Sequence, residues 1–342
     1  MICSRIETGL QAAAIASAAT FARMLLATAP LLLAVPAQAQ TWPARPVTLV
    51  SPGAAGSSTD VIARILTPRL SEVLGQAVIV EDIGGAGGMK GVAHVANALP
   101  DGYQMVIGHS GTHAISQTLY KHPLYDAVTD FAPVVLIAEV PIVLIARPNL
   151  PASNLQDFIA YARANQAKMQ YGSPGVGSTV QLACALLNAA IGIDVAHIPY
   201  RGGGPAMQDL IAGNIDYQCV TTAPALPHIA SKLVKPLAIL TKHRSPILPS
   251  LASAHEQGAT DFEVMSWNAF FLPKGTPSAI VRRLNEATIA TIDTPSVQVR
   301  LHDVGATVVA ADRRTPEYLR KFVTSEIAKF GASIRAGHLS ID

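Results

Sequence analysis

Short apolar runs alternate along the chain with segments whose apolar residues recur at helical spacing. In residues 61–74 the apolar side chains fall on one helical face, and Gly75 follows as a stop signal. Comparable patterns predict helices at residues 84–97, 155–165, 277–292 and 316–334. The short runs predict strands at residues 46–51, 77–81, 105–108, 134–138, 142–146, 169–172, 195–199, 216–220 and 236–240.

This alternation of strand and helix predicts an α/β fold with mostly parallel sheets. In such sheets ligands bind beyond the carboxyl ends of the strands. The turns that follow strands are therefore the first places to look for a binding site.

The first forty residues differ from the rest. Residues 24–35 are apolar, are flanked by Arg23 and Pro36, and precede the small residues of an A-x-A site at 37–39. This order is typical of a secretory signal peptide, and the apolar run is shorter than the about 20 residues that span a bilayer. We predict a signal peptide at residues 1–39 and a periplasmic protein that starts at Gln40; an N-terminal membrane anchor is the alternative.

Composition narrows the choice of partners. The 342 residues are 50% hydrophobic and 14% charged, with a net charge of +2, which argues against an intrinsically disordered chain. No block of five or more Lys or Arg residues occurs, so no nucleic-acid partner is expected.

Two cysteines remain after the signal segment. Cys184 and Cys219 are an even number in an exported chain, which permits one disulfide. Two buried thiols, one in a helix and one in a strand, are the slightly preferred interpretation.

Several segments resemble catalytic or cofactor-binding motifs, but each lacks a residue that the motif requires. Residues 108–112 read G-H-S-G-T, so Ser110 has part of the surroundings of a hydrolase nucleophile, but the closing glycine is replaced by Thr112. The glycine run at 84–91 has Lys90 where a dinucleotide motif needs its third glycine. No cluster of metal-ligand residues accompanies His109 and His113. We therefore expect no catalytic residue, metal or cofactor, and keep a secreted serine hydrolase using Ser110 as an alternative.

Two small-residue turns lead from a strand into a helix, at residues 52–60 and 172–179. Each offers hydroxyl groups and the free backbone N–H groups of a helix N-terminus, which together suit an anion. One turn lies in each half of the chain, which suggests an anion held between two lobes. Ordinary helix capping is the alternative.

The whole chain after residue 39 resembles the Bug-type solute-binding proteins of tripartite tricarboxylate transporters. The resemblance rests on several segments that occur in the same order along the chain, among them WPARPVTLVSPGAAGSSTDVIAR, GQAVIVEDIGGAGGMKG, YGSPGVGSTVQLA, HIPYRGGGPAMQDLIAGNIDY and FFLPKGTPSAIVRRLN. It implies a type II periplasmic-binding-protein fold, with two α/β lobes joined by two crossing strands and a ligand cleft between them. Lobe 1 would comprise residues 40–140 and 270–342, and lobe 2 residues 141–269.

The resemblance also implies a set of ligand-binding residues, carried over by motif. They are Pro52, Gly53, Ser57, Ser58, Thr59 and Asp60 in the first turn, Ser110 and Thr112 in the S-G-T-H segment, Gly175, Gly177, Ser178 and Thr179 in the second-lobe turn, and Tyr200 and Val220 beyond it.

Three departures from the family pattern concern selectivity. Gly53 and Ser57 stand where an aromatic residue and a glycine are usual, which we expect to leave room beside residue 53. Gln181 replaces a usual histidine, and Val220 replaces a usual aspartate. Loss of that aspartate removes a partner for a ligand ammonium, so we expect a carboxylate without an amine.

The resemblance implies a receptor without catalytic activity that captures a small organic carboxylate and delivers it to the membrane permease subunits of the transporter. We expect a monomer. A sensor subunit of the same fold, which presents its ligand to a membrane kinase, is a further alternative.

Overall fold

The computed structural model describes residues 42–260 and 262–336; the signal peptide predicted at residues 1–39 lies outside this part. Its strands are β1 (Val47–Ser51), β2 (Val78–Asp82), β3 (Gln104–His109), β4 (Phe131–Ala146), β5 (Gln170–Ser173), β6 (Ala196–Pro199), β7 (Tyr217–Thr221), β8 (Lys235–Ile239), β9 (Met265–Pro273) and β10 (Thr307–Val308). Its α-helices are α2 (Ser58–Leu74), α3 (Met89–Ala96), α4 (Ser116–Leu119), α5 (Leu155–Asn165), α6 (Thr179–Ile191), α7 (Gly203–Ala212), α8 (Thr222–Ala230), α9 (Ser278–Ile292), α10 (Pro295–Asp303) and α11 (Pro316–Ala336).

Short helical turns complete the described elements: η2 (Ala86–Gly88), η3 (Gly111–Ile115, a π-helical turn), η4 (Gln166–Lys168) and η5 (Ala311–Arg313). None of the helices in the described residues is long and apolar enough to cross a membrane.

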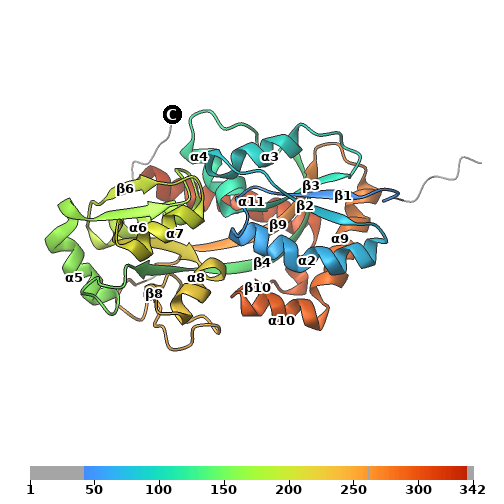
Figure 1. Ribbon diagram of the computed structural model, residues 1–342. Helices are drawn as coiled ribbons and strands as arrows, with labels where there is room; N and C mark the ends of the chain where they lie inside the picture. The colour runs from blue at the N-terminus through green and yellow to red at the C-terminus, as the bar shows by residue number, and fades with distance from the viewer. Residues whose placement is uncertain (1–41, 261, 337–342) are drawn as a thin grey trace, which may run out of the picture. The chain divides into compact units, whose positions relative to one another are not determined.

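The strands form two groups that share β4. The order along the sheet is β2-β1-β3-β9-β4-β7-β5-β6; β10 pairs with the middle of β4, and β8 pairs with its last residues. The first group, with β1, β2, β3, β9 and β10, forms one lobe, and the second group, with β5 to β8, forms the other (Figure 1).

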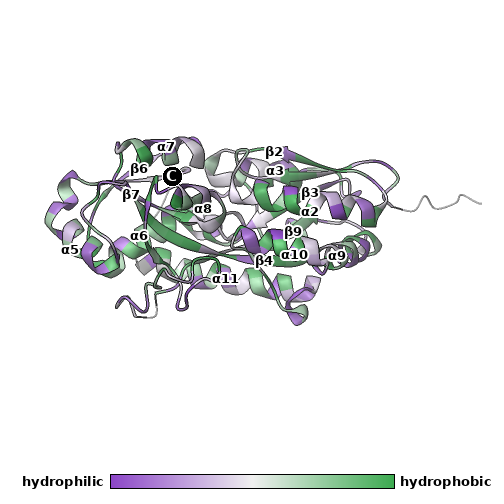
Figure 2. Cartoon of the chain, turned by 60° about the horizontal axis from the view of Figure 1, so that its bottom comes forward, coloured by the Kyte–Doolittle hydropathy of each residue, from purple (hydrophilic) through white to green (hydrophobic). Residues whose placement is uncertain are grey.

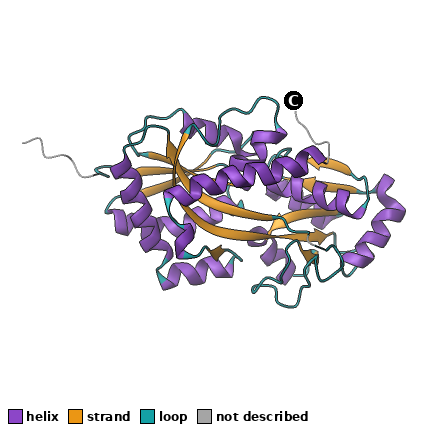
Figure 3. Cartoon of the chain, turned by 180° about the vertical axis from the view of Figure 1, so that it is seen from behind, coloured by secondary structure: helices purple, strands orange, loops and turns teal. Residues whose placement is uncertain are grey.

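The 16-residue strand β4 runs from one lobe into the other. Its first part pairs with β9, from Phe131 opposite Pro273 to Pro141 opposite Met265, and its last part, from Ile142 on, pairs with β7 and β8. Figure 3 shows these long strands through the middle of the protein. The separate strands that the sequence predicted at 134–138 and 142–146 were wrong as two elements: they are one strand. The polar Glu139 and the helix-breaking Pro141, which interrupt the apolar run, lie in the segment that passes between the lobes.

The expected mostly parallel sheet was also wrong. The outer pairs β1–β2, β1–β3, β5–β6 and β5–β7 are parallel, but every pairing made by β4 or β9 is antiparallel. Strand–helix alternation predicts the parallel pairs, since each requires a crossover helix. It says nothing about β4 and β9, whose connection passes through the whole second lobe.

The apolar core covers both faces of the first-lobe strands because their side chains alternate. Met105 and Ile107 pack with Leu66 of α2 and Leu284 of α9, while Val106 joins a second cluster with Leu319 of α11. Figure 2 shows the apolar colour of β4 inside the protein and hydrophilic stretches on outer helices such as α5 and α9.

The predicted helices at 155–165, 277–292 and 316–334 are confirmed, with ends within two residues. The helix predicted at 61–74 begins three residues earlier, because Ser57 caps it with a side chain that accepts from the Asp60 N–H. Gly75 ends the helix in the left-handed conformation (φ 72°), as a C-terminal glycine does.

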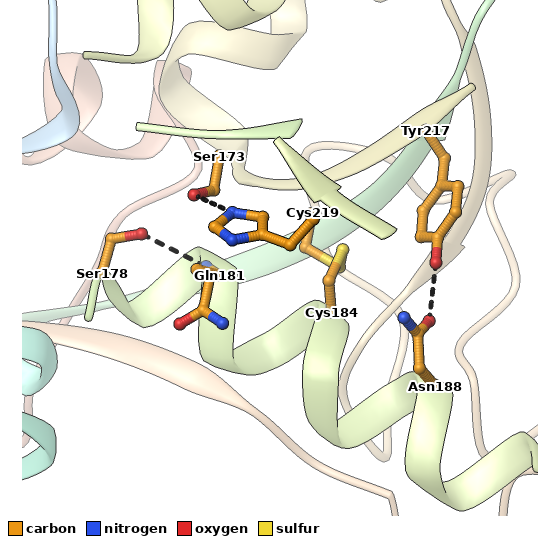
Figure 4. Close-up of a disulfide and its surroundings, with 8 residues drawn as sticks. Ser173, Ser178, Gln181, Cys184, Asn188, Tyr217 and Cys219 are labelled. Atoms are coloured by element: carbon orange, nitrogen blue, oxygen red, sulfur yellow. Dashed lines mark hydrogen bonds between the residues drawn. A yellow bond between two sulfur atoms is a disulfide. The ribbon is translucent and has the colours of Figure 1, made fainter. Parts of the chain in front are cut away.

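The two cysteines are joined by a disulfide between Cys184 of α6 and Cys219 of β7 (Figure 4). The preferred expectation of two free thiols was therefore wrong, although their placement in a helix and a strand was right. The sequence could not decide this, because bond formation needs Cα atoms within about 7 Å, and the 5.5 Å separation here depends on how α6 packs on β7.

Candidate ligand-binding site

The first-lobe turn joins β1 to α2 through Pro52–Asp60. The Ser57 hydroxyl lies 3.1 Å from the Thr59 hydroxyl, and the Ser51 hydroxyl donates to Thr59 Oγ1 at 3.3 Å. The backbone N–H groups of Ser58 and Thr59 belong to the first turn of α2 and have no helical carbonyl to bond, which leaves them directed out of the helix N-terminus. The turn therefore presents N–H groups and hydroxyls beyond the end of β1.

Asp60 is engaged inside this turn. Its Oδ2 accepts from the Gly56 N–H at 2.7 Å, its Oδ1 pairs with Arg64 Nε at 2.6 Å, and the residue is buried. Arg64 also pairs with Asp82 at the end of β2. This carboxylate fixes the turn and does not extend toward solvent.

Gly53 has no spare room beside it. A Cβ atom at this position would lie 2.5 Å from Ser57 Oγ and 3.2 Å from Thr59 Oγ1. The Ser57 side chain thus fills the space that the glycine was expected to leave, so the two departures from the family pattern compensate each other.

The second-lobe turn joins β5 to α6. Ser178 caps α6: its hydroxyl donates to the Gly175 carbonyl at 2.9 Å and accepts from the Gln181 N–H at 3.3 Å. Gly177 (φ 83°) donates its N–H to Gln181 Oε1 at 3.4 Å. For Ser178 the capping role that the sequence left open is observed, and the first N–H groups of α6 remain directed out of the turn.

Ser173 is fixed from the neighbouring strand. Its hydroxyl donates to the Gly175 carbonyl, and His197 Nε2 of β6 lies 2.8 Å from Ser173 Oγ (Figure 4). Burial lowers the pKa of His197, which favours the neutral imidazole. The β5–α6 turn is therefore held by side chains of its own lobe.

Hydroxyl groups join the lobes at the centre of the junction. Ser110, directly after β3, donates to Ser266 Oγ of β9 at 3.3 Å, and Thr179 Oγ1 at the start of α6 lies 3.1 Å from Ser110 Oγ. All three residues are buried. Side chains from three distant parts of the sequence thus meet where the two lobes are in contact.

Histidine side chains border this cluster. His109 Nδ1 accepts from the Gly111 N–H at 3.0 Å and lies 3.4 Å from Thr179 Oγ1, and burial lowers the pKa of His109 to about 4. His113 stacks on Phe271, and burial, with His109 nearby, lowers its pKa well below the usual value. Thr112 bridges the backbone of His109 and Nδ1 of His113.

The Ser110 hydroxyl bonds the hydroxyls of Thr179 and Ser266, and His109 directs its Nδ1 to Gly111 and Thr179. The serine hydrolase alternative needs a base within hydrogen-bond reach of the nucleophile. This geometry does not favour it.

Two further hydrogen bonds join the lobes. The Tyr120 hydroxyl donates to the Val176 carbonyl at 2.9 Å, and the Thr222 hydroxyl donates to the Val304 carbonyl at 3.1 Å. The lobes are therefore in contact on both sides of the Ser110 cluster.

Two of the expected site residues lie apart from this cluster. The Tyr200 hydroxyl donates to Asp209 of α7 at 2.6 Å, and Val220 packs with Val143 and Ile239 in the second-lobe core. In the described residues no group of three or more His, Cys, Asp or Glu side chains is arranged to hold a metal ion.

Sequence reasoning missed Ser266 and Asn268 of β9 and the junction contacts of Tyr120. The β9 residues carried a signal: they are polar positions in an otherwise apolar strand, and both are buried. Which lobe they would face could not be known before the strand was placed.

The fold defines a class: two α/β lobes joined by crossing strands are the architecture of periplasmic solute-binding proteins. The chain belongs to the tripartite tricarboxylate transporter receptor family, whose model matches residues 62–339. The family resemblance and the predicted fold class are thereby confirmed.

Solved structures agree closely with this one. The periplasmic binding protein BugD is 35% identical, with a TM-score of 0.84, covering 87% of this chain and 99% of BugD. MatC from Rhodopseudomonas palustris, with bound malate, is 36% identical, with a TM-score of 0.82, covering 86% of this chain and 100% of MatC. R. palustris Rpa4515, with adipate, is 33% identical, with a TM-score of 0.84, covering 87% of this chain and 99% of that chain.

The family is therefore one of solute receptors rather than enzymes, and its members include periplasmic binding proteins with carboxylate ligands.

Proposed function

We propose that this protein is a periplasmic receptor that captures a small organic carboxylate between its lobes and delivers it to the permease subunits of a tripartite tricarboxylate transporter. The observation that carries the proposal is the contact between the lobes at Thr179, the first residue of helix α6, whose hydroxyl lies 3.1 Å from the hydroxyl of Ser110 after strand β3. Helix N-termini attract anions through their free N–H groups and the helix dipole. MatC with malate and Rpa4515 with adipate support the carboxylate class.

The ligand site we propose comprises the residues expected from the sequence, chiefly those of the two turns. Ser58, Thr59 and Thr179 offer backbone or hydroxyl donors near the junction, while Asp60, Gly177 and Ser178 hold the turns in shape. In this proposal lobe 1 consists of residues 40–140 and 270–342 and lobe 2 of residues 141–269, and the lobes move about β4 and β9. The receptor acts as a monomer.

Export is part of the proposal. Residues 1–39 have the sequence pattern of a secretory signal peptide, which predicts cleavage before Gln40. N-terminal sequencing of the protein recovered from the periplasm tests this. A membrane-bound product that retains residues 24–39 contradicts it.

A thermal-shift screen of carboxylates tests the binding function. A ligand at 100 times its Kd stabilises the folded protein by about 2.7 kcal/mol, enough for a clear shift in Tm. We expect succinate, adipate or an aromatic acid to stabilise it and aspartate and glutamate to fail, because the Ser110, Thr179 and Ser266 side chains at the junction offer no counter-charge for an ammonium group and an unpaired buried charge is costly. Stabilisation by the amino acids alone contradicts the selectivity; no shift with any carboxylate contradicts the function.

A further inference from the structure

Asn268 is a buried amide without a visible role in the fold. It lies on β9, is 1% exposed, and its Oδ1 has no hydrogen-bond partner in the described residues. Burying an unpaired amide is costly, and such groups in native proteins call for a specific explanation.

The position of Asn268 in the sheet supplies that explanation. Side chains two residues apart on a strand share a face, so Asn268 lies on the same face of β9 as Ser266, which bonds Ser110 at the lobe junction. On its other side along the strand is Phe270, which packs in the α2–α9 core. Asn268 thus stands between the apolar core and the hydroxyl cluster that joins the lobes.

His109 is the cross-strand neighbour of Asn268. The two residues are directly opposite in the antiparallel β3–β9 register, which places their Cβ atoms about 4.5–5.5 Å apart on one face. Ala138, the partner of Asn268 on β4, carries only a methyl group and offers Oδ1 no hydrogen-bond donor from its side chain.

The hydrogen bonds of His109 fix its tautomer. Because the Gly111 N–H donates to Nδ1, that nitrogen carries a lone pair, and the neutral ring holds its proton on Nε2. Burial lowers the pKa of His109 to about 4, so the ring is neutral at physiological pH. His109 therefore offers an N–H donor on the same face of the sheet as the Oδ1 acceptor of Asn268.

We propose that His109 and Asn268 form a neutral subsite for a ligand hydroxyl group, so that this receptor prefers hydroxy-substituted carboxylates to their unsubstituted counterparts. A hydroxyl both accepts from Nε2–H and donates to Oδ1. A carboxylate oxygen cannot donate to Oδ1, and an ammonium group cannot accept from Nε2–H. The inference rests on the proposed carboxylate-receptor function and specifies its substrate class.

Calorimetry with pairs that differ in one hydroxyl tests the inference on the wild-type protein. The pairs are malate against succinate and 2-hydroxyglutarate against glutarate, with both enantiomers of each hydroxy acid. We expect the preferred enantiomer to bind at least tenfold more tightly than the unsubstituted acid. Equal affinities within a pair overturn this inference and leave the proposed function standing. Absence of binding by every carboxylate overturns both.

The Asn268→Leu variant tests the residue assignment. It keeps a similar volume and removes the acceptor, so the preference for the hydroxy acid should fall below about threefold while the affinity for succinate or glutarate is largely kept. Gln218→Leu is the matched control, since Gln218 of β7 is also buried and its Nε2 also has no partner in the described residues. A tenfold preference that survives in Asn268→Leu overturns the assignment, and the wild-type comparison remains decisive if that variant does not fold.

Discussion

At the scale of single residues, the first-lobe turn shows how neighbouring substitutions compensate. Gly53 and Ser57 share one space, since a Cβ on residue 53 would lie 2.5 Å from Ser57 Oγ. Interiors as closely packed as this respond to one added methyl group.

We therefore predict that Gly53→Ala lowers the free energy of unfolding by about 1–3 kcal/mol through overpacking. In a Ser57→Gly background, which costs only a few tenths of a kcal/mol at an N-cap, most of that loss should disappear. Urea denaturation of the double-mutant cycle measures the coupling.

Gly204→Ala on α7 is the control for this cycle, because nothing lies within 4 Å of its added Cβ, and it should not destabilise the protein. Additive effects of Gly53→Ala and Ser57→Gly would show that the two positions are independent.

The partly buried His109 makes stability depend on pH. Its folded-state pKa, about 4, is below the usual 6.5, so the unfolded chain binds the proton more readily. The stabilisation is complete above about pH 6.5 and is lost as the pH falls toward 4, by up to about 3 kcal/mol.

His109→Gln, which can still accept from the Gly111 N–H, should therefore show a smaller loss of stability over this range. Burial also lowers the pKa values of His113 and His197, so these residues should still cause part of the loss of stability at low pH in the variant. Denaturation curves at several pH values measure the slopes, and identical slopes would contradict the burial argument.

At the scale of elements, the disulfide ties helix α6, whose N-terminus faces the lobe junction, to strand β7. It closes a loop with a sequence separation of 35 residues. Cross-links of this kind stabilise by about 2–4 kcal/mol, mainly by restricting the unfolded chain.

Cys184→Ala with Cys219→Ala should lower the free energy of unfolding by about this amount, and dithiothreitol should destabilise the wild type similarly. The reductant should leave the double variant unchanged. Equal stability of oxidised and reduced wild type would show that the bond contributes nothing.

The N-terminus of α6 is the element we expect to hold the ligand most directly. Replacing Ser178 and Thr179 together by Ala removes a cap, the Ser110 contact and charge-assisted donors, so carboxylate affinity should fall at least tenfold while the fold is retained.

Asn154→Ala is the matched control, since it removes the side-chain cap of α5 away from the junction. It should cost about 1 kcal/mol of stability without changing the affinity. Calorimetry compares the two variants, and unchanged affinity in the α6 variant would mean that its hydroxyls serve only as caps.

At the scale of the whole molecule, contacts between the lobes determine how readily the closed arrangement forms. Tyr120 contributes one of them, through its hydroxyl on the Val176 carbonyl. A receptor whose closed form is less populated binds its ligand with a proportionally lower apparent affinity.

Tyr120→Phe should accordingly weaken binding by about two- to tenfold, the equivalent of one hydrogen bond of about 0.5–1.5 kcal/mol. The radius of gyration of the saturated protein, measured by X-ray scattering, should not change. An unchanged Kd would show that this contact does not bias closure.

The sequence predicted several helix ends, caps and turns correctly because these features depend on residues close together in the chain. The stops and caps around α2 and α5, and the turns that lead from β1 and β5 into helices, follow from side chains bonding backbone a few residues away. The segments that resemble the family also predicted the two-lobed fold.

Tertiary structure alone decided the rest, because each feature joins distant positions. The continuity of β4 across Glu139 and Pro141 depends on pairing with β9, more than a hundred residues later. The Cys184–Cys219 bond depends on α6 packing against β7. The contact among Ser110, Thr179 and Ser266 depends on how both lobes are placed. The spacing of residues in the sequence does not indicate which polar side chains will lie together in a buried site.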